Sequence, residues 1–336
     1  KAYPELGSEL ARRIEGKLPE GWEKALPEFP ADAKGMASRS SSGKTINALA
    51  PILPELMGGS ADLAPSNNTW MQNIPAFQPG SYEGRNMQYG VRELGMSAVV
   101  NGMAYHKGFI PYGATFLTFF DYCHPVIRVA ALSHIQSIWV FTHDSIGVGE
   151  DGPTHQPVEH VTVMRAIPNL LSIRPADANE VSEAWKAAIN KKNGPAALTL
   201  TRQNLPTLDR SVYAPASGLH KGAYVLADLG KNAPQLILMA SGSEVSLIVE
   251  AGQKLAEEGI SVRLVSFPSW ELFNDQEKAY RDTVLPPELD RRLAVEAGIS
   301  QGWHRWVGSK GDVLGLDRYG ASAPANVVFE KLGFSV

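Results

Sequence analysis

The residues Ile138–Phe141 form a run of four consecutive apolar side chains, all of them aromatic or β-branched. Such a run is typical of a strand that is buried on both faces, as the strands of parallel sheets are. Strand-like segments recur at Leu170–Ile173 and Ala196–Thr201, and segments with helical periodicity separate the three. This alternation predicts an α/β fold with a mainly parallel sheet flanked by helices.

The alternating pattern is interrupted once, over residues 209–220, and a second series of strands and helices starts at Gln235–Met239. We therefore expect a boundary near residue 215. The prediction is two consecutive α/β domains, over residues 41–215 and 216–336, each with a mainly parallel sheet flanked by helices.

The first part of the chain has a different composition. Residues 1–40 are rich in Pro, Glu, Lys and Gly. This composition predicts a linker segment wrapped over the surface, with Trp22 and Phe29 as its anchors.

Helical periodicity predicts helices that include Thr45–Leu53 and Phe116–Ser133. In the second of these, Phe116, Phe119 and Tyr122 recur every three residues and are expected to line one helical face. Capping boxes are expected at two other helix starts, at Asp177 with Glu180 and at Ser241 with Glu244.

Charge and cysteine content exclude several classes of protein. The 336 residues carry a formal net charge of -4, so no basic field favours nucleic acid or an anionic membrane as a partner. The most apolar stretch is interrupted by Arg128, His134 and Gln136, which leaves nothing long enough to span a bilayer. The single cysteine, Cys123, excludes an intrachain disulfide and a zinc site of several cysteines, and it fits a reducing compartment.

A polar loop follows the apolar run, and residues 142–157 read THDSIGVGEDGPTHQP. Ligands of open α/β sheets bind outside the carboxyl ends of the strands, so this loop is predicted to form a polar binding pocket. Its acids and histidines could also be drawn as a metal cluster with His160. They lack the fixed spacing of a metal motif, and acid–base or hydrogen-bonding work explains them equally well, so we expect no metal ligands in this chain.

Three other segments are unremarkable when taken alone. Glu93, in YGVRELGM, is an acid in the first turn of a helix, where it would complement the helix dipole. The aromatic stripe of residues 116–122 is typical of a core. Residues 58–67 read GGSADLAPSN, a turn after a strand that is rich in small polar residues.

Together, these segments closely resemble the transketolase family, the thiamine-diphosphate enzymes that move two-carbon units between sugar phosphates. The resemblance covers nearly the whole chain and is closest to plastid and bacterial members. It implies a thiamine-diphosphate pyrimidine-binding fold followed by a transketolase C-terminal domain. The motifs that carry it are GGSADLAPSN, YGVRE-GM, PYGATFL-F, THDSIG-GEDGPTHQP, RPAD, TRQN and YGASAPA.

The resemblance implies a role for each candidate residue. Glu93 would hydrogen-bond the pyrimidine ring of the cofactor, which would stack on Phe116, Phe119 and Tyr122, with Asp62 nearby. The donor sugar and the reacting oxygen would contact His143, Asp151 and His155, which with Glu93 form the catalytic set. The substrate phosphate would be held, beside His143, by Arg39, Ser66 and Arg202.

One departure from the family pattern is large. The family holds the cofactor's diphosphate and a Mg²⁺ or Ca²⁺ ion with an amino-terminal domain that carries a GDG motif, and this chain has no GDG. We therefore expect an incomplete chain that is inactive alone. Its expected partners are the diphosphate-binding domain of the same enzyme and, in a homodimer, a second subunit. Leu94 is a smaller departure, since relatives often carry His or Phe there.

The implied activity is transfer of a two-carbon ketol unit from a ketose phosphate of the xylulose 5-phosphate type to an aldose phosphate of the ribose 5-phosphate type, in the pentose phosphate pathway or the Calvin cycle. The location would be the chloroplast stroma in a photosynthetic eukaryote and the cytoplasm otherwise. Alternatives are a 1-deoxyxylulose-5-phosphate synthase, the β-subunit of a 2-oxo-acid dehydrogenase, or a non-catalytic assembly subunit. The phosphate contacts favour sugar phosphates, and the retained Glu93, Asp151 and His155 argue against loss of turnover.

Overall fold

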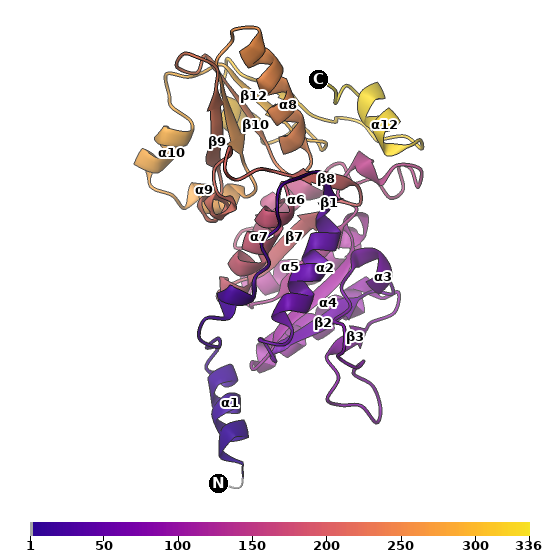
Figure 1. Cartoon of the computed structure of the whole chain (residues 1–336). Coiled ribbons are helices and arrows are strands. Elements are labelled where there is room, and N and C mark those ends of the chain that lie inside the picture. Colours follow the sequence, from indigo (N-terminus) through magenta and orange to yellow (C-terminus); the bar gives the residue numbers. More distant parts are fainter. Residues whose placement is uncertain (1–2) are drawn as a thin grey trace.

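The computed structural model describes residues 3–336 and contains two α/β units that are stacked end to end (Figure 1). The first unit is built on a six-stranded sheet with the order β3-β2-β4-β5-β7-β6. Every neighbouring pair in this sheet is parallel. Its strands are β2 (Leu56–Ser60), β3 (Asn86–Gln88), β4 (Ile110–Phe116), β5 (Ile138–Thr142), β6 (Leu171–Ile173) and β7 (Ala196–Leu200).

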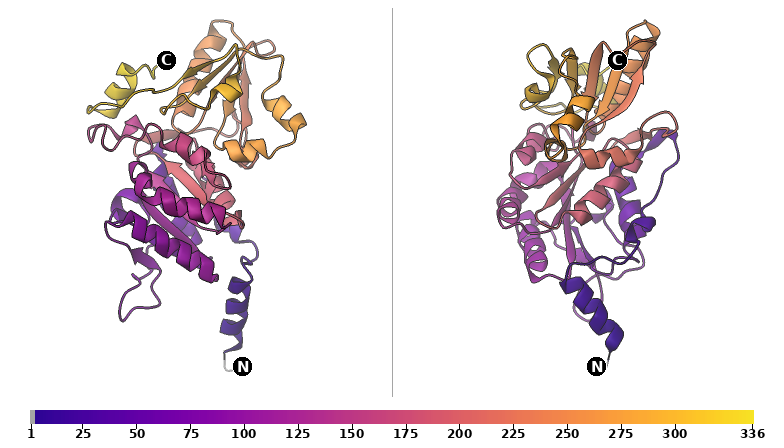
Figure 2. Two further views of the ribbon diagram at one scale, coloured as in Figure 1. Left: turned by 180° about the vertical axis from the view of Figure 1, so that it is seen from behind. Right: turned by 90° about the vertical axis from the view of Figure 1, so that its left-hand side faces the viewer.

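Helices cover both faces of this sheet, as the view from the side shows (Figure 2). One face carries α2 (Ser38–Leu49) and α7 (Ala178–Asn190), which pack against each other. The other face carries α4 (Glu93–His106), α5 (Phe120–Leu132) and α6 (His160–Arg165). A short helix, α3 (Ala64–Asn67), follows β2. Burial on both faces explains why β5 is apolar at every position but its last.

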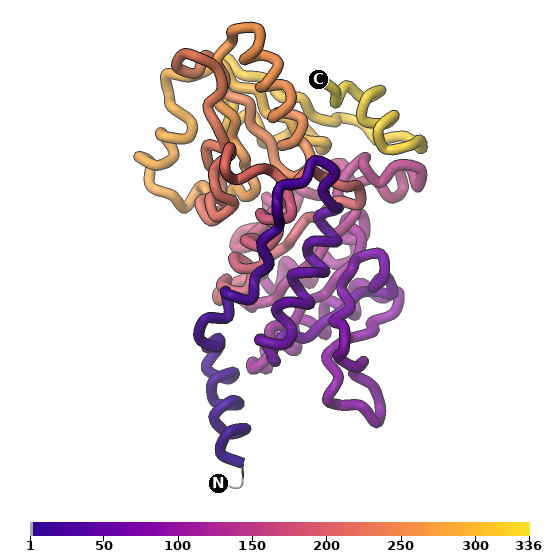
Figure 3. Tube along the Cα trace, in the orientation of Figure 1, coloured from indigo at the N-terminus to yellow at the C-terminus, as the bar shows by residue number. Residues whose placement is uncertain are grey.

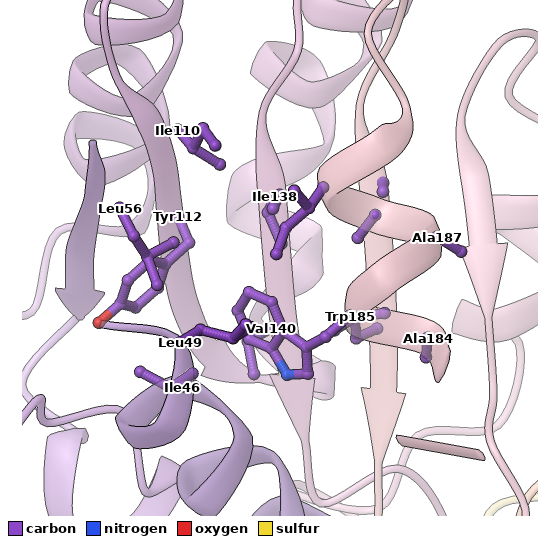
Figure 4. Close-up of a cluster of buried hydrophobic side chains, with 14 of the residues drawn as sticks. Ile46, Leu49, Leu56, Ile110, Tyr112, Ile138, Val140, Ala184, Trp185 and Ala187 are labelled. Atoms are coloured by element: carbon purple, nitrogen blue, oxygen red, sulfur yellow. The ribbon is translucent and has the colours of Figure 1, made fainter. Parts of the chain in front are cut away.

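The core under α2 and α7 is centred on Trp185, which is fully buried (Figure 4). Its ring lies edge-on to that of Tyr112, with 6.2 Å between the centroids. The indole Nε1 donates a hydrogen bond of 2.9 Å to Ser42 Oγ, so the polar atom of the tryptophan is satisfied inside the core. The side chain therefore ties both helices to one face of the sheet.

The second unit has a five-stranded sheet with the order β13-β12-β10-β11-β9, in which only β9 runs antiparallel to its neighbour. The predicted α/β class with mainly parallel sheets is confirmed. The strands are β9 (Tyr224–Leu229), β10 (Leu236–Ala240), β11 (Val262–Ser266), β12 (Arg292–Val295) and β13 (Asp312–Leu314). The helices are α8 (Glu244–Glu257), α9 (Trp270–Asn274), α10 (Lys278–Val284), α11 (His304–Val307) and α12 (Ala325–Lys331).

The domain boundary expected near residue 215 stays a prediction. It falls between β8 (Asn204–Thr207) and β9, just before the 3-10 helix η4 (Ala216–Lys221). Within residues 3–336, no helix combines the length and the apolar character that crossing a bilayer requires.

The segment expected as a linker contains regular structure: α1 (Pro4–Ile14), η1 (Trp22–Ala25) and β1 (Asp32–Ala37), which pairs antiparallel with β8. Helix α1 projects from the body, and the chain then runs along the first unit to β1 (Figure 3). Both expected anchors are in contact with that unit. Trp22 is buried in the core of α2 and α7, and the backbone of Phe29 exchanges two hydrogen bonds of 2.9 Å with the Asn179 amide.

The prediction that one helix spans Phe116–Ser133 is wrong at its start. Strand β4 continues to Phe116 because Thr115 and Phe116 pair with the last residues of β5. A 3-10 turn, η2 (Leu117–Phe119), then leads into α5. Tertiary pairing with β5 overrides the local helical periodicity, so the three aromatic residues lie on three different elements.

The expected starts of two other helices also need correction. Helix α2 begins at Ser38 and ends at Leu49, since the serine-rich segment before Thr45 is already helical. At α8 the N-cap is Ser243, without a side-chain cap bond, and Ser241 and Glu244 do not form a capping box. At α7 the cap is present, because the Asp177 carboxylate accepts a hydrogen bond of 2.9 Å from the Glu180 amide. The Glu180 carboxylate reaches back to the Ala176 amide instead of that of Asp177.

Replacing Trp185 tests the packing of α2 and α7 on the sheet. We expect Trp185→Ala to lower the free energy of unfolding by about 3–5 kcal/mol in denaturant titration, because it leaves a large cavity. Trp185→Phe should cost less, about 1–3 kcal/mol, since it retains a ring but leaves the Ser42 hydroxyl unpaired. Trp70→Ala is the matched control at an exposed tryptophan and should change the free energy by less than about 0.5 kcal/mol. Equal losses for Trp185→Ala and Trp70→Ala would contradict this account.

Candidate active site

The candidate site lies at the carboxyl edge of the first sheet, where the adjacent strands β2, β4 and β5 end at Ser60, Phe116 and Thr142. Parallel strands all release their following loops at this edge, so side chains that are distant in sequence meet there. The loop of residues 143–157, here called the histidine loop, starts directly after β5.

His143 is held in one orientation by its neighbours. Its ring stacks on Phe116, with 3.7 Å between the centroids, and its exposed fraction is 3%. Its backbone has φ 60, a left-handed conformation that is costly for a residue with a side chain. Nδ1 lies 2.8 Å from Thr142 Oγ1, which donates its own proton to Asn67 Oδ1 at 2.6 Å.

This chain of hydrogen bonds selects a tautomer. A threonine hydroxyl has one proton, and here Asn67 accepts it, so His143 Nδ1 must be the donor to Thr142. In the neutral ring, Nε2 is then an acceptor. His143 can therefore accept a hydrogen bond from a hydroxyl group of a ligand.

Cationic side chains surround His143. Burial lowers the pKa of His143 to about 3, and the positive charges of Arg39 and Arg202 and the nearby His155 add to this effect. Burial and the proximity of Arg202 also lower the pKa of Arg39. Within residues 3–336, neither arginine forms an ion pair with a carboxylate. Two guanidinium groups without a counter-ion beside a neutral histidine make a site for an anion such as a phosphate.

Arg39 is also aligned by a backbone group. Its Nη1 donates a hydrogen bond of 2.5 Å to the carbonyl oxygen of Ser66, and its Nε is buried without a partner among the described residues. The half-buried Ser66, in the GGSADLAPSN motif, thus contacts the arginine with which it was predicted to share a ligand. Arg202 follows β7 and is exposed.

The three predicted aromatic residues remain neighbours although they leave three different elements. The rings of Phe116 and Phe119 are parallel, with 6.0 Å between centroids, and those of Phe119 and Tyr122 are 6.2 Å apart. His155 presents its edge to Phe116 and Phe119 at 6.3 and 5.7 Å. Tyr122 is 61% exposed, so the aromatic wall is open on one side and could stack a planar ring.

Glu93 is the first residue of α4 and is 8% exposed. Its Oε1 accepts a hydrogen bond of 3.2 Å from Thr115 Oγ1, and Thr115 precedes Phe116 on β4. The carboxylate is therefore fixed next to the strand end that carries the aromatic wall. The sequence pattern gave no indication of Thr115 as its partner.

Two predicted residues are not joined to this group. Asp62 and Asp151 are exposed, and neither side chain forms a hydrogen bond within the part of the chain that the structure describes. Asp62 follows β2 with a left-handed φ of 61. Among residues 3–336, no cluster of three or more His, Cys, Asp or Glu side chains is arranged to hold a metal ion.

Sequence reasoning missed the polar residues that orient His143, namely Thr142 and Asn67. Asn67 is buried and is the last residue of the GGSADLAPSN motif, so its position in a polar turn after a strand was the only signal in the sequence. Its amide Nδ2 donates to Ser60 Oγ at 3.1 Å, which leaves Oδ1 facing Thr142. Both residues act on the site through His143.

The low pKa of His143 predicts how stability depends on pH. The pKa of His143 is about 3 in the folded chain and about 6.5 in the unfolded chain. Between these two pH values, His143 is protonated in the unfolded chain but not in the folded one. In the parent chain, the free energy of unfolding should therefore fall as the pH is lowered from about 6.5 to about 4. His143→Gln should make this fall less steep, by at most about 1.4 kcal/mol per pH unit. Denaturant titrations across this range measure it. Identical slopes for the variant and the parent would show that His143 titrates normally.

Both α/β units match known protein families. Residues 34–207 match the family described as transketolase, pyrimidine binding domain, and residues 222–335 match the transketolase-like TK C-terminal domain. The chain is 53% identical over 336 residues to a transketolase of Geobacillus stearothermophilus. The aligned region covers 100% of this chain and 50% of that protein. It is 49% identical over 338 residues to a chloroplastic transketolase of Craterostigma plantagineum. That alignment covers 100% of this chain and 64% of the other protein.

A solved structure agrees with these relatives. Transketolase of Pichia stipitis in complex with sedoheptulose-7-phosphate matches with a TM-score of 0.94 and 43% identity, over 99% of this chain and 49% of that one. The chain spans about half the length of most of the curated relatives that it matches. Because the matches extend over both units and nearly all of the sequence, the chain belongs to the transketolase family.

Proposed function

We propose that this chain supplies the pyrimidine-binding and C-terminal units of a transketolase. The reaction is transfer of a two-carbon ketol unit from a ketose phosphate of the xylulose 5-phosphate type to an aldose phosphate of the ribose 5-phosphate type. The observation that carries this proposal is the pair of arginines, Arg39 and Arg202, beside a neutral, stacked His143. This group suits a phosphorylated polyol, because the cations bind phosphate and Nε2 accepts from a hydroxyl.

The family uses thiamine diphosphate, and the residues present fit its pyrimidine ring. Phe116, Phe119 and Tyr122 form an open aromatic wall, and the fixed carboxylate of Glu93 lies next to it. We propose that the wall stacks the ring, that Glu93 hydrogen-bonds it, and that Asp62 lies at its border. When bound, thiamine diphosphate would supply an acidic thiazolium C–H, which becomes a carbon nucleophile on loss of its proton.

The remaining roles belong to the histidine loop and to the phosphate contacts. His155 would exchange a proton with the substrate oxygen at the reacting carbon, and its edge-on position at the aromatic wall supports this role. Asp151 would accept hydrogen bonds from sugar hydroxyls once a substrate is bound. Arg39, Arg202 and Ser66 would hold the phosphate, at the end of the sugar opposite the reacting carbon. His143 would contact the sugar between the reacting carbon and the phosphate.

A complete enzyme requires more than this chain. We propose that the cofactor's diphosphate and a Mg²⁺ or Ca²⁺ ion are held by a domain of the same enzyme outside this sequence, so that the chain alone is inactive. A homodimer is supported by the apolar residues that α4 exposes. Leu94 is 54% exposed there, Val99 and Tyr105 are exposed on the same helix, and Val91 is exposed just before it. The proposed setting is the pentose phosphate pathway or the Calvin cycle, in the chloroplast stroma of a photosynthetic eukaryote and in the cytoplasm of other cells.

The phosphate site can be tested with two ketose donors. In the whole enzyme, we expect Arg39→Leu to raise KM for xylulose 5-phosphate by about 10–100-fold, because a charge-assisted bond is lost. The KM for an unphosphorylated ketose should change less than about threefold. Arg128→Leu, an arginine on α5 away from the site, is the matched control. Equal changes for both donors would contradict a phosphate-binding role.

The catalytic assignment depends on Glu93. In a coupled assay with xylulose and ribose phosphates, the whole enzyme should transfer the ketol unit, and Glu93→Ala should reduce kcat by about 10²–10⁴-fold. Glu159→Ala, at a partly exposed glutamate, is the control. An enzyme with no turnover of sugar phosphates would favour one of the other thiamine-diphosphate enzymes, and unchanged turnover of Glu93→Ala would favour a non-catalytic subunit.

A further inference from the structure

The residue that follows His143 faces the second α/β unit instead of the site. Asp144 is buried, and its Oδ2 lies 2.9 Å from Arg174 Nε. Arg174 follows β6 in the RPAD motif, and its side chain is 2% exposed. A buried ion pair thus holds the start of the histidine loop.

The other side of Arg174 is bound by the second unit. Its Nη1 donates to the carbonyl oxygen of Ser241 at 2.8 Å and to the carboxylate of Glu244, and its Nη2 donates to Ser243 Oγ at 3.3 Å. Ser241 and Ser243 lie in the turn between β10 and α8, and Glu244 is the first residue of α8. Glu244 is itself fixed, because its Oε2 accepts from the Ala297 amide at 3.0 Å. The guanidinium group therefore bridges Asp144 to a rigid turn of the other unit.

The rest of the histidine loop is also held by the second unit. Gln156 Nε2 donates to two carbonyl oxygens at 2.9 Å, those of Gly149 in the loop and of Ala321 in the YGASAPA motif. Ser322 Oγ donates to the carbonyl oxygen of Glu150. Helix α12 packs on the 3-10 turn η3 (Ile146–Val148) in the middle of the loop. The start, the middle and the end of the loop all contact the second unit.

We propose that the second α/β unit positions the histidine loop for substrate, and that Arg174 is the positioning residue through which it fixes His143. The inference rests on the proposed function and adds a role for the C-terminal half. His143 has an unfavourable left-handed backbone, and such a conformation persists only where its surroundings determine it. The Asp144–Arg174 bond supplies this constraint one residue later. Arginine suits the task because its planar fork reaches two carboxylates at once.

A purely adhesive role of Arg174 is the alternative, and the chain offers a matched control for it. Arg165, on α6, forms a second buried ion pair with the second unit, with its Nη1 2.7 and 2.8 Å from the two Glu296 oxygens. Its guanidinium group also lies over the ring of Trp270, 4.1 Å from the centroid. Within residues 3–336 it forms no hydrogen bond or ion pair with the histidine loop. Loss of either pair should weaken the contact between the units, but only one should disturb His143.

The experiment compares Arg174→Lys with Arg165→Lys in the whole enzyme with its cofactors. We expect both variants to lower Tm. Only Arg174→Lys should reduce kcat/KM for the ketose phosphate, by at least about tenfold, because a small displacement of His143 is costly to the reaction. Asp144→Asn, which retains the shape of the side chain, should give the same loss, and the double variant should lose no more than either alone. Thiamine diphosphate affinity should stay within about twofold, because neither residue lies in the aromatic wall.

A readout without turnover separates this inference from the proposed function. NMR of ¹⁵N-labelled histidine in the whole enzyme should show displaced His143 ring resonances in Arg174→Lys and unchanged ones in Arg165→Lys. If the parent enzyme does not act on sugar phosphates, the proposed function fails while these resonances still test the positioning. Unchanged His143 resonances in Arg174→Lys, or equal losses of kcat/KM in the two lysine variants, would overturn the inference.

Discussion

A fully buried guanidinium group, that of Arg174, joins the two α/β units and lies between carboxylates contributed by each. Burying one such charge is unfavourable unless it is paired and its donors are satisfied. Here the donors are satisfied by Asp144, Glu244 and the turn at Ser241. The relative placement of the units is thereby coupled to the first residues of the histidine loop. Contacts of Gln156 and of α12 extend this coupling along the loop.

The parallel sheet of the first unit supplies the other constraint. It brings the ends of β2, β4 and β5 to one edge, so that Asn67, Phe116 and His143 meet although they come from three separate segments. Two arginines that have no carboxylate partner in the described part of the chain, and a histidine kept neutral by burial, make this edge attractive to an anion. The positive charges of the two arginines repel each other in the protein without ligand, and a bound phosphate would compensate this repulsion.

Much of this site could be predicted from residue types and their order. The motif segments indicated His143, His155, Arg39 and Glu93 as candidates. In the structure, His143 and His155 lie against the aromatic wall, and Arg39 lies near His143. The partners of these residues could not be predicted. Thr115, Thr142 and Asn67 are small polar residues of a kind that recurs throughout the chain, and only their burial and hydrogen bonds distinguish them. The expected roles of all the candidate site residues stay predictions, and Asp62 and Asp151 in addition form no side-chain hydrogen bond within residues 3–336.

Local periodicity and motifs were sufficient to predict the alternation of strands and helices, the family, and the residue types at the strand ends. Only tertiary contacts determine in which element these residues lie and which unit their side chains face. Phe116 ends a strand because β5 pairs with it. His143 and Asp144 are adjacent in the chain, yet one faces the site and the other faces the second unit. Asp144 has this role because Arg174 is 30 residues away in sequence and 2.9 Å away in space, and no local pattern encodes that distance.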